Sequence, residues 1–71
     1  MEMTPVTSSN VAAIGYDQES SILRVQFNSG RLYDYYSVPQ ELYEGLLHSG
    51  SKGTFLNEQI KKAGYSYDKV G

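Results

Sequence analysis

The sequence predicts an α+β domain in which a three-stranded antiparallel β-meander is followed by two short helices packed on one face of the sheet. Three observations predict this class. Short apolar or aromatic segments with two-residue alternation fill the first half of the chain, turn-forming residues separate them, and apolar residues at helical spacing fill the second half. Two amphipathic helices and a one-sided sheet each need a partner surface, and packing them together satisfies all three.

Length and composition limit the chain to a small globular protein. It has 71 residues, 39% hydrophobic and 20% charged, with no cysteine and one histidine. This is enough for one domain, and it favours neither a disulfide framework nor a metal centre, so we expect no cofactor and no metal. The start of the sequence lacks the pattern of a signal peptide and no segment is long and apolar enough to span a membrane, which predicts a cytoplasmic protein.

The first two strands follow a polar start. Residues 1–9 are polar, include a proline and are expected to be a flexible lead-in, with the domain itself spanning residues 10–71. Residues 11–16 are apolar and end at a turn-forming segment, which predicts a strand. Residues 22–27 alternate, so that Leu23, Val25 and Phe27 share one face of the next strand.

The third strand, residues 31–37, is rich in tyrosine, and the loop before it decides where the tyrosines point. A three-residue loop with Gly30 in the left-handed conformation pairs Phe27 with Arg31. In that register Tyr33 and Tyr35 lie on the same face as the apolar residues of the second strand, and so belong to the core.

A two-residue loop is the alternative for this hairpin. It pairs Phe27 with Leu32, turns the tyrosines outward and places Asp34 on the apolar face. An unpaired carboxylate is costly to bury, so the three-residue loop is favoured. The outer face would then show Arg24, Gln26, Leu32, Asp34 and Tyr36.

Two helices complete the predicted fold. Pro39 suits the first turn of a helix that ends at Gly50, with an apolar side formed by Leu42, Tyr43, Leu46 and Leu47. Gly45 weakens this helix by about 1 kcal/mol relative to alanine. Ser51 is expected to cap a second helix that ends at Gly64 and has an apolar stripe of Phe55, Leu56, Ile60 and Ala63. Tyr65 and Tyr67 follow as an extended segment that closes one side of the core.

Charge is distributed unevenly. The first fifty residues carry a net charge of −4 and the remaining residues +2, so any attraction to phosphate is expected toward the C-terminal end. Lys52 and Gly53 lie at a glycine-containing corner before the second helix. This corner can be interpreted as an anion-binding site or as a tight connection between the two helices. Candidate nucleic-acid or anion-binding residues are Lys52, Gly53, Lys61, Lys62, Arg24, Arg31 and Tyr36.

A pattern of residues extends over nearly the whole chain. Its members are Val6, Thr7, Ser8, Ser9, Ala13, Ile14, Gly15, Tyr16, Asp17, Leu23, Val25, Phe27, Gly30, Tyr33, Tyr35, Val38, Pro39, Tyr43, Leu46, Ser51, Gly53, Phe55, Asn57 and Ile60. This pattern resembles the KTSC domain, which occurs at the C-terminus of some lysyl-tRNA synthetases and as small stand-alone proteins of bacteria and phages. The chain resembles the stand-alone form. The resemblance implies RNA binding without an established catalytic activity, and the family-motif residues Tyr33, Tyr35, Phe55 and Asn57 are expected to be structural.

Two functions follow as hypotheses. The first is a non-catalytic module that binds RNA or another nucleic acid through the basic residues named above. The alternative is a small protein-interaction adaptor, or a phage-derived regulator that binds a host protein through the outer sheet face around Leu32 and Tyr36. An exposed strand edge also makes a homo-oligomer conceivable. No enzymatic activity is expected, because His48 is the only imidazole and the carboxylates are scattered.

Overall fold

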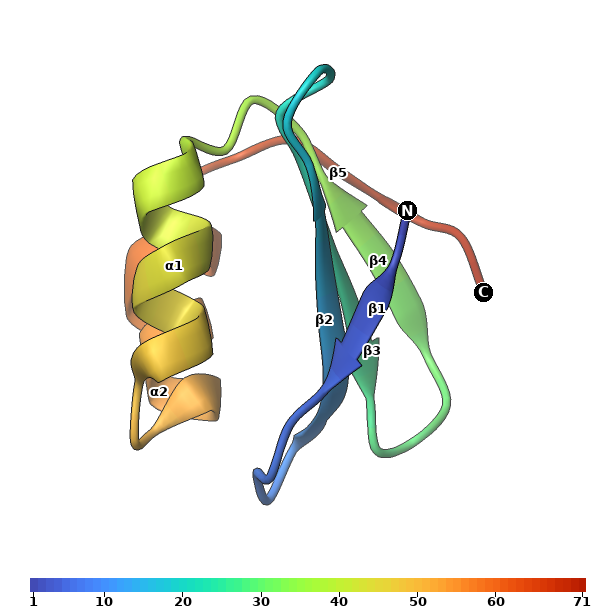
Figure 1. The fold of residues 1–71 in the computed structure, drawn as a ribbon, viewed down its shortest axis with the longest axis vertical. Coiled ribbons are helices and arrows are strands. Elements are labelled where there is room, and N and C mark those ends of the chain that lie inside the picture. The colour runs from blue at the N-terminus through green and yellow to red at the C-terminus, as the bar shows by residue number, and fades with distance from the viewer.

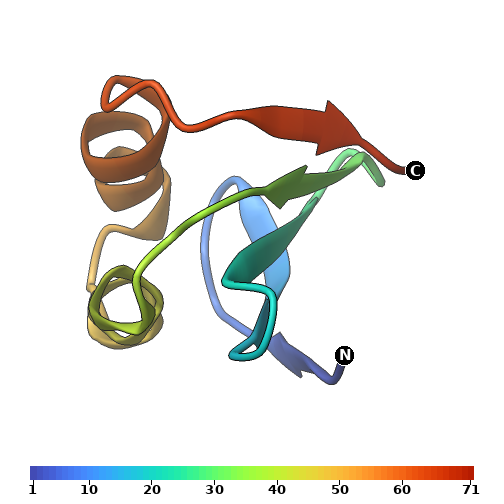
Figure 2. The same cartoon turned by 90° about the horizontal axis from the view of Figure 1, so that it is seen from above.

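The computed structural model describes residues 1–71 and consists of one sheet with the helices on one of its faces (Figures 1 and 2). Five antiparallel strands lie in the order in which they occur along the chain, and the helical segments are inserted between the fourth and the fifth. The elements are β1 (Met3–Pro5), β2 (Val11–Asp17), β3 (Ile22–Phe27), β4 (Leu32–Tyr35), α1 (Gln40–His48), α2 (Lys52–Leu56), the π-helical turn η1 (Asn57–Lys61) and β5 (Tyr67–Lys69). The α+β class and the placement of the helices are confirmed.

The prediction of three strands was too low, because each end of the chain adds a short edge strand. Residues 1–9 were expected to be a lead-in, yet β1 pairs with β2, with Met3 opposite Gly15. A Cβ on Gly15 would lie 2.7 Å from the Met3 sulfur, so the glycine permits this close approach. Pro5 is compatible with β1 because an edge strand leaves some N–H groups without a partner in the sheet.

The strand β5 was expected only as an extended tail. It pairs with β4, with Tyr67 opposite Tyr35 and Asp68 opposite Asp34. This pairing makes β4 an interior strand, and Figure 2 shows β5 running away from the helical layer toward the C-terminus.

The β3–β4 hairpin has the register favoured by the sequence. Val25 pairs with Tyr33, the Phe27 amide donates to the Arg31 carbonyl, and Gly30 has a φ of 93°. On β2, the register shifts between Val11 and Ala13, as in a β-bulge. The extra residue brings Val11 and Ile14 to the same buried face, although their spacing would otherwise separate them.

The helical half departs from the prediction in three details. Ser51 makes no side-chain capping hydrogen bond, and Ala63 is exposed beyond the last helical turn. The second helix also changes from α to π after Leu56, and the Lys62 amide donates to the carbonyl of Asn57, five residues earlier. Gly64 has a φ of 83° and reverses the chain toward β5, which confirms it as the terminator.

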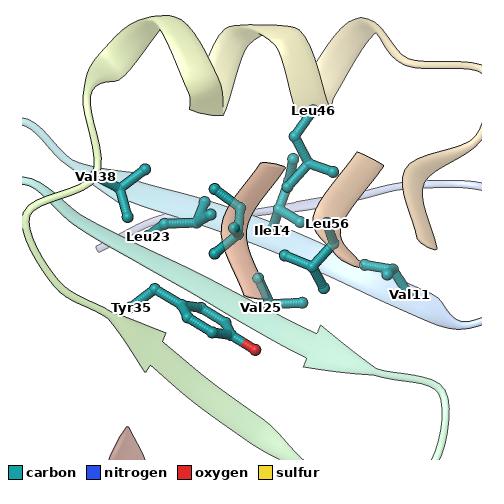
Figure 3. Packing of buried hydrophobic residues seen from close by; sticks show 9 residues of the cluster. Val11, Ile14, Leu23, Val25, Tyr35, Val38, Leu46 and Leu56 are labelled. Carbon is teal, nitrogen blue, oxygen red and sulfur yellow. The ribbon is translucent and has the colours of Figure 1, made fainter. Parts of the chain in front are cut away.

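The core lies between the helices and the β2–β3 part of the sheet (Figure 3). Its fully buried members are aliphatic, and Tyr35 lies at its margin on β4. The cluster consists of Val11, Ile14, Leu23, Val25, Tyr35, Val38, Leu46, Leu56 and Ile60. At the far end of the sheet from α2, the rings of Tyr16 and Tyr43 stack with centroids 5.1 Å apart. None of the helices combines the length and the apolar character that crossing a bilayer requires.

Candidate functional site

A groove lies between the inner face of the sheet at β4 and β5 and the α2–η1 segment. Its volume is about 610 Å³, which lies within the range of pockets that hold small ligands. One wall comes from β4, β5 and the end of β3, and the other from the α2–η1 segment. The lining residues are Ser9, Asn10, Phe27, Asn28, Ser29, Arg31, Tyr33, Tyr35, Gly53, Leu56, Lys61, Tyr65 and Tyr67. We call this the aromatic groove.

Four aromatic rings form a continuous wall of the groove. Tyr33 contacts Phe27 and Tyr67 edge-to-face, with centroids 5.7 and 5.9 Å apart. Tyr35 lies 5.7 Å from Tyr67 and 6.4 Å from Tyr33. These separations are those of interacting aromatic pairs, so the rings hold one another in place. The wall therefore exists before any ligand arrives.

The exposure of the wall changes from one ring to the next. Tyr35 is 3% exposed and belongs to the core margin, Tyr33 is half-buried, and Tyr67 is 60% exposed. Burial raises the pKa of Tyr35 above its ordinary value, and the neighbouring Tyr33 and Tyr67 raise it further. The two tyrosines of the expected inward-facing motif thus do face inward, and both also line the groove.

The charge of the groove is positive although the chain as a whole is acidic. Lys61 places its Nζ 5.3 Å from the centroid of the Phe27 ring, and Arg31 lines the same cavity. Both residues are exposed, and no carboxylate belongs to the lining. A chain of net charge −2 therefore presents a local surface with two cations and no anion.

The π-helical turn explains how Lys61 reaches this surface. In a π-helix the hydrogen bonds join residues five apart and each turn holds more residues than the roughly 3.6 of an α-helix, so residues five apart lie closer to one face than they do in an α-helix. Lys61 is the fifth residue after Leu56, and both line the groove. A regular α-helix would rotate Lys61 away from the face on which Leu56 and Ile60 are buried.

Lys62 and Lys52 have other partners. The Lys62 Nζ lies 3.0 Å from the Glu58 Oε1, one helical turn earlier, and does not line the groove. The Lys52 Nζ donates to the carbonyl of Ser49 at 2.7 Å. Lys52 lines a smaller polar depression of about 200 Å³. This depression adjoins the aromatic groove, because Ser9, Asn10 and Gly53 line both.

Arg24 and Tyr36 lie on the opposite face of the sheet. Arg24 Nε and Nη2 donate to the two Asp34 carboxylate oxygens at 2.6 and 2.8 Å, and this hydrogen-bonded carboxylate raises the pKa of the guanidinium. The Tyr36 hydroxyl donates to Asp68 Oδ2 at 2.8 Å, which raises its pKa as well. Because Arg24 and Tyr36 lie on the outer face beside Asp34 and Asp68, the structure does not bring them together with Lys61 and Arg31.

Asp34 itself differs from the expectation for an outer-face residue, because it is only 5% exposed. The cause is β5, which places Asp68 beside it in register and encloses it between two strands. Two carboxylates directly opposite each other repel. The paired guanidinium of Arg24 and the hydroxyl of Tyr36 compensate that repulsion, so the buried carboxylate is satisfied.

The remaining motif residues lie in the helical layer. The Phe55 ring packs against α1 at Gly45, where a Cβ would lie 2.8 Å from its Cζ. Asn57 begins η1, and its carbonyl accepts the i+5 hydrogen bond described above. Neither residue lines the groove.

Several groove residues were not among the candidates. Asn10, Asn28 and Phe27 come together at one end of the cavity, and Tyr65 and Tyr67 arrive from the other end of the chain. The alternation of Tyr65 and Tyr67 was visible in the sequence, but only the pairing of β5 with β4 shows that they meet the motif tyrosines.

Comparison with known proteins places this fold in a family. The model of the KTSC domain matches residues 7–68. An uncharacterised protein of Stutzerimonas stutzeri is 39% identical over 70 residues, covering 99% of each chain, and a protein of Tsukamurella paurometabola is 44% identical over 59 residues, covering 83% of this chain and 88% of that one.

Two further relatives extend the comparison. The crystal structure of a KTSC domain protein from Yersinia pestis superposes with a TM-score of 0.92 at 33% identity and covers 99% of this chain and 97% of that one. A lysine–tRNA ligase of Nostoc punctiforme is 36% identical over 51 residues, which are 72% of this chain and 9% of the ligase. Sequence, fold and the matched motif agree, and the chain belongs to the KTSC domain family.

Proposed function

We propose that this protein is a non-catalytic module that binds RNA in the aromatic groove. The observation that carries the proposal is the composition of the lining, in which Lys61 and Arg31 are the only charged residues and four interacting rings form the wall. Cations interleaved with aromatic rings are the surface that proteins use for flexible nucleic-acid strands.

The similarity to lysine–tRNA ligases supports the choice of RNA among polyanions. The matched segment is a small part of those enzymes, so it is their RNA-dependent context and not their activity that bears on this chain. In energetic terms, each phosphate neutralised by a cation releases counterions, and affinity then falls as salt rises. Two groove cations give only a modest electrostatic contribution, so we expect weak binding.

The test uses a matched pair of neighbouring lysines. Fluorescence anisotropy with labelled single-stranded and structured RNA, measured at several salt concentrations, gives the affinity and its salt slope. Lys61→Gln removes a groove cation, whereas Lys62→Gln removes the same charge from the adjacent position, where it is paired with Glu58. We expect Lys61→Gln to reduce the salt slope by about 0.7 and Lys62→Gln to leave it nearly unchanged.

Two results would contradict the proposal. The first is the absence of salt-dependent RNA binding by the wild-type protein. The second is an equal loss of affinity in both lysine variants, which would indicate general charge attraction and not a groove. Capture of a specific protein by a preparation that retains no RNA would favour the adaptor in place of the RNA module.

A further inference from the structure

We infer that the aromatic groove recognises an unpaired base, which stacks on the ring of Tyr67, while Lys61 and Arg31 hold the adjacent phosphates. This inference rests on the proposed RNA function and goes beyond it, because phosphate attraction alone needs no base. The groove would then distinguish single strands from duplexes and from phosphate chains without bases.

The position of Tyr67 is the first support. The Tyr67 side chain is 60% exposed. A tyrosine exposed to this extent ordinarily has few contacts that hold its ring in one orientation. Here Tyr33 and Tyr35 contact the Tyr67 ring with interplanar angles of 68° and 40°. The ring is therefore supported by its neighbours while much of its surface stays open, which are the properties of a stacking platform.

The groove also carries groups that suit the edge of a base. Asn28 donates through its Nδ2 to the carbonyl of Ser8 at 3.2 Å, which fixes the side chain and leaves its Oδ1 as an acceptor. Asn10 lines the same end of the cavity. Side-chain amides are both donors and acceptors, and unpaired bases present both on their Watson–Crick edges.

The charge of the lining favours a nucleotide over a polypeptide. Aromatic grooves also bind proline-rich peptides, which are neutral or basic in many cases. The cationic residues Lys61 and Arg31, without any carboxylate in the lining, attract an anionic chain and give a basic peptide no partner. The groove is therefore expected to bind an unpaired nucleotide in preference to a proline-rich peptide.

Duplex RNA is expected to be a poor ligand for a geometric reason. Its bases are stacked on one another, and exposing one of them costs a few kcal/mol. An unstructured strand already offers its faces. The preference between strand and duplex thus separates base stacking from attraction to phosphate.

The experiment compares two single strands of equal length and phosphate charge, one with and one without bases, and adds a duplex and a peptide. Tyrosine fluorescence or calorimetry follows titration with an unstructured oligoribonucleotide, an abasic strand of the same length, the corresponding duplex and a proline-rich peptide. Stacking of one base contributes about 1–3 kcal/mol to the binding free energy, so the oligoribonucleotide should bind roughly fivefold to 150-fold more tightly than the abasic strand.

Three variants locate the contact. Tyr67→Ala should abolish the difference between the two strands, whereas Tyr67→Phe keeps the ring and should preserve it. Tyr36→Ala truncates a tyrosine on the opposite face and should also preserve it. Far-ultraviolet circular dichroism of each variant shows whether the fold is retained.

The outcomes distinguish this inference from the proposed function. Equal affinity for the abasic strand and the oligoribonucleotide would overturn base recognition while leaving salt-dependent RNA binding intact. No binding of any nucleic-acid probe would overturn both. Binding of the peptide in the groove with loss in Tyr67→Ala, in place of the oligoribonucleotide, would assign the aromatic wall to a polypeptide and also overturn the inference.

Discussion

The inner face of one sheet is put to two different uses. Beneath the helices, β2 and β3 contribute aliphatic side chains that are completely shielded from water, among them Ile14, Leu23 and Val25. Across the groove from the α2–η1 segment, β4 and β5 contribute Tyr33 and Tyr67, whose rings remain partly or mostly open. The helical segments pack closely over β2 and β3, whereas the groove separates them from most of β4 and β5, and the composition changes at that boundary.

This difference separates the stabilising half of the molecule from the candidate binding half. An aliphatic side chain contributes most to the stability of the fold when it is fully removed from water, whereas tyrosine also makes favourable contacts at a surface that stays in contact with water. The covered half therefore supports the fold. The open half, with Lys61 and Arg31 beside it, presents a ready surface to a ligand.

The largest effect is expected from a cavity in the covered half. Leu46 is fully buried between α1 and the sheet, so Leu46→Ala should reduce the free energy of unfolding by about 2–5 kcal/mol. Tyr67→Ala is the corresponding truncation in the open half, where most of the ring is exposed, and should reduce it by about 1 kcal/mol through the lost contacts with Tyr33 and Tyr35. Urea denaturation of both variants checks this, and comparable losses would remove the division between the halves.

In the open half a groove separates β4 and β5 from the α2–η1 segment, so contacts on the outer face must stabilise these two strands. Asp34 on β4 is buried and depends on the two hydrogen bonds from Arg24. Arg24→Leu leaves that carboxylate without its partner and should cost about 1–3 kcal/mol. Adding Asp34→Asn should restore part of the loss, and a double-mutant cycle by denaturation measures the coupling. Simple additivity of the two changes would show that the pair is not what anchors β4.

A glycine tests how closely the helices pack over the covered half. Helix propensity alone predicts that Gly45→Ala stabilises the protein by about 1 kcal/mol. The structure predicts the opposite, because the new Cβ would meet the Phe55 ring at 2.8 Å, and overpacking costs about 1–3 kcal/mol. Gly50→Ala serves as the control, since nothing lies within 4 Å of its Cβ position. Stabilisation by Gly45→Ala would mean that the Phe55 ring moves aside at little cost.

The smallest effect is a pH dependence at the boundary between the halves. Burial raises the pKa of Tyr35 above the unfolded value of 10.0, so the folded protein holds this proton more tightly than the unfolded chain. The stabilisation is complete below pH about 10 and is lost as the pH rises through the folded pKa. Tyr35→Phe removes the titrating group, and its stability should decline less steeply in alkaline solution. An identical decline in the two proteins would contradict the assignment to Tyr35.

The sequence was sufficient to predict the hairpin register. Of the two possible positions for Asp34, the high cost of burying an unpaired carboxylate favours the observed one. Asp34 is nevertheless buried, on the other face, because β5 covers it and Arg24 pairs with it. The alternation of apolar and polar residues along a strand predicts which face of the sheet a residue occupies. Its exposure to solvent also depends on strands that are distant in the sequence and pair beside it.

The missing elements were those with weak local signals. β1 and β5 have three residues each, and β1 includes Pro5, so neither has the length or composition from which a strand is predicted. The π-turn has no sequence signature of this kind, and Lys61 at its end lines the groove whereas Lys62 does not. The candidate list contained the two groove cations, and tertiary structure was needed to separate them from the other basic residues.

The most direct test of the division between the two halves is a nuclear magnetic resonance titration of the isotope-labelled protein with an unstructured oligoribonucleotide. Our account predicts salt-sensitive changes in amide shifts that concentrate around the aromatic groove, at Phe27, Tyr33, Lys61 and Tyr67, with little change on α1 or at Arg24 and Tyr36. Changes centred on the outer sheet face, or no changes at all, would contradict it.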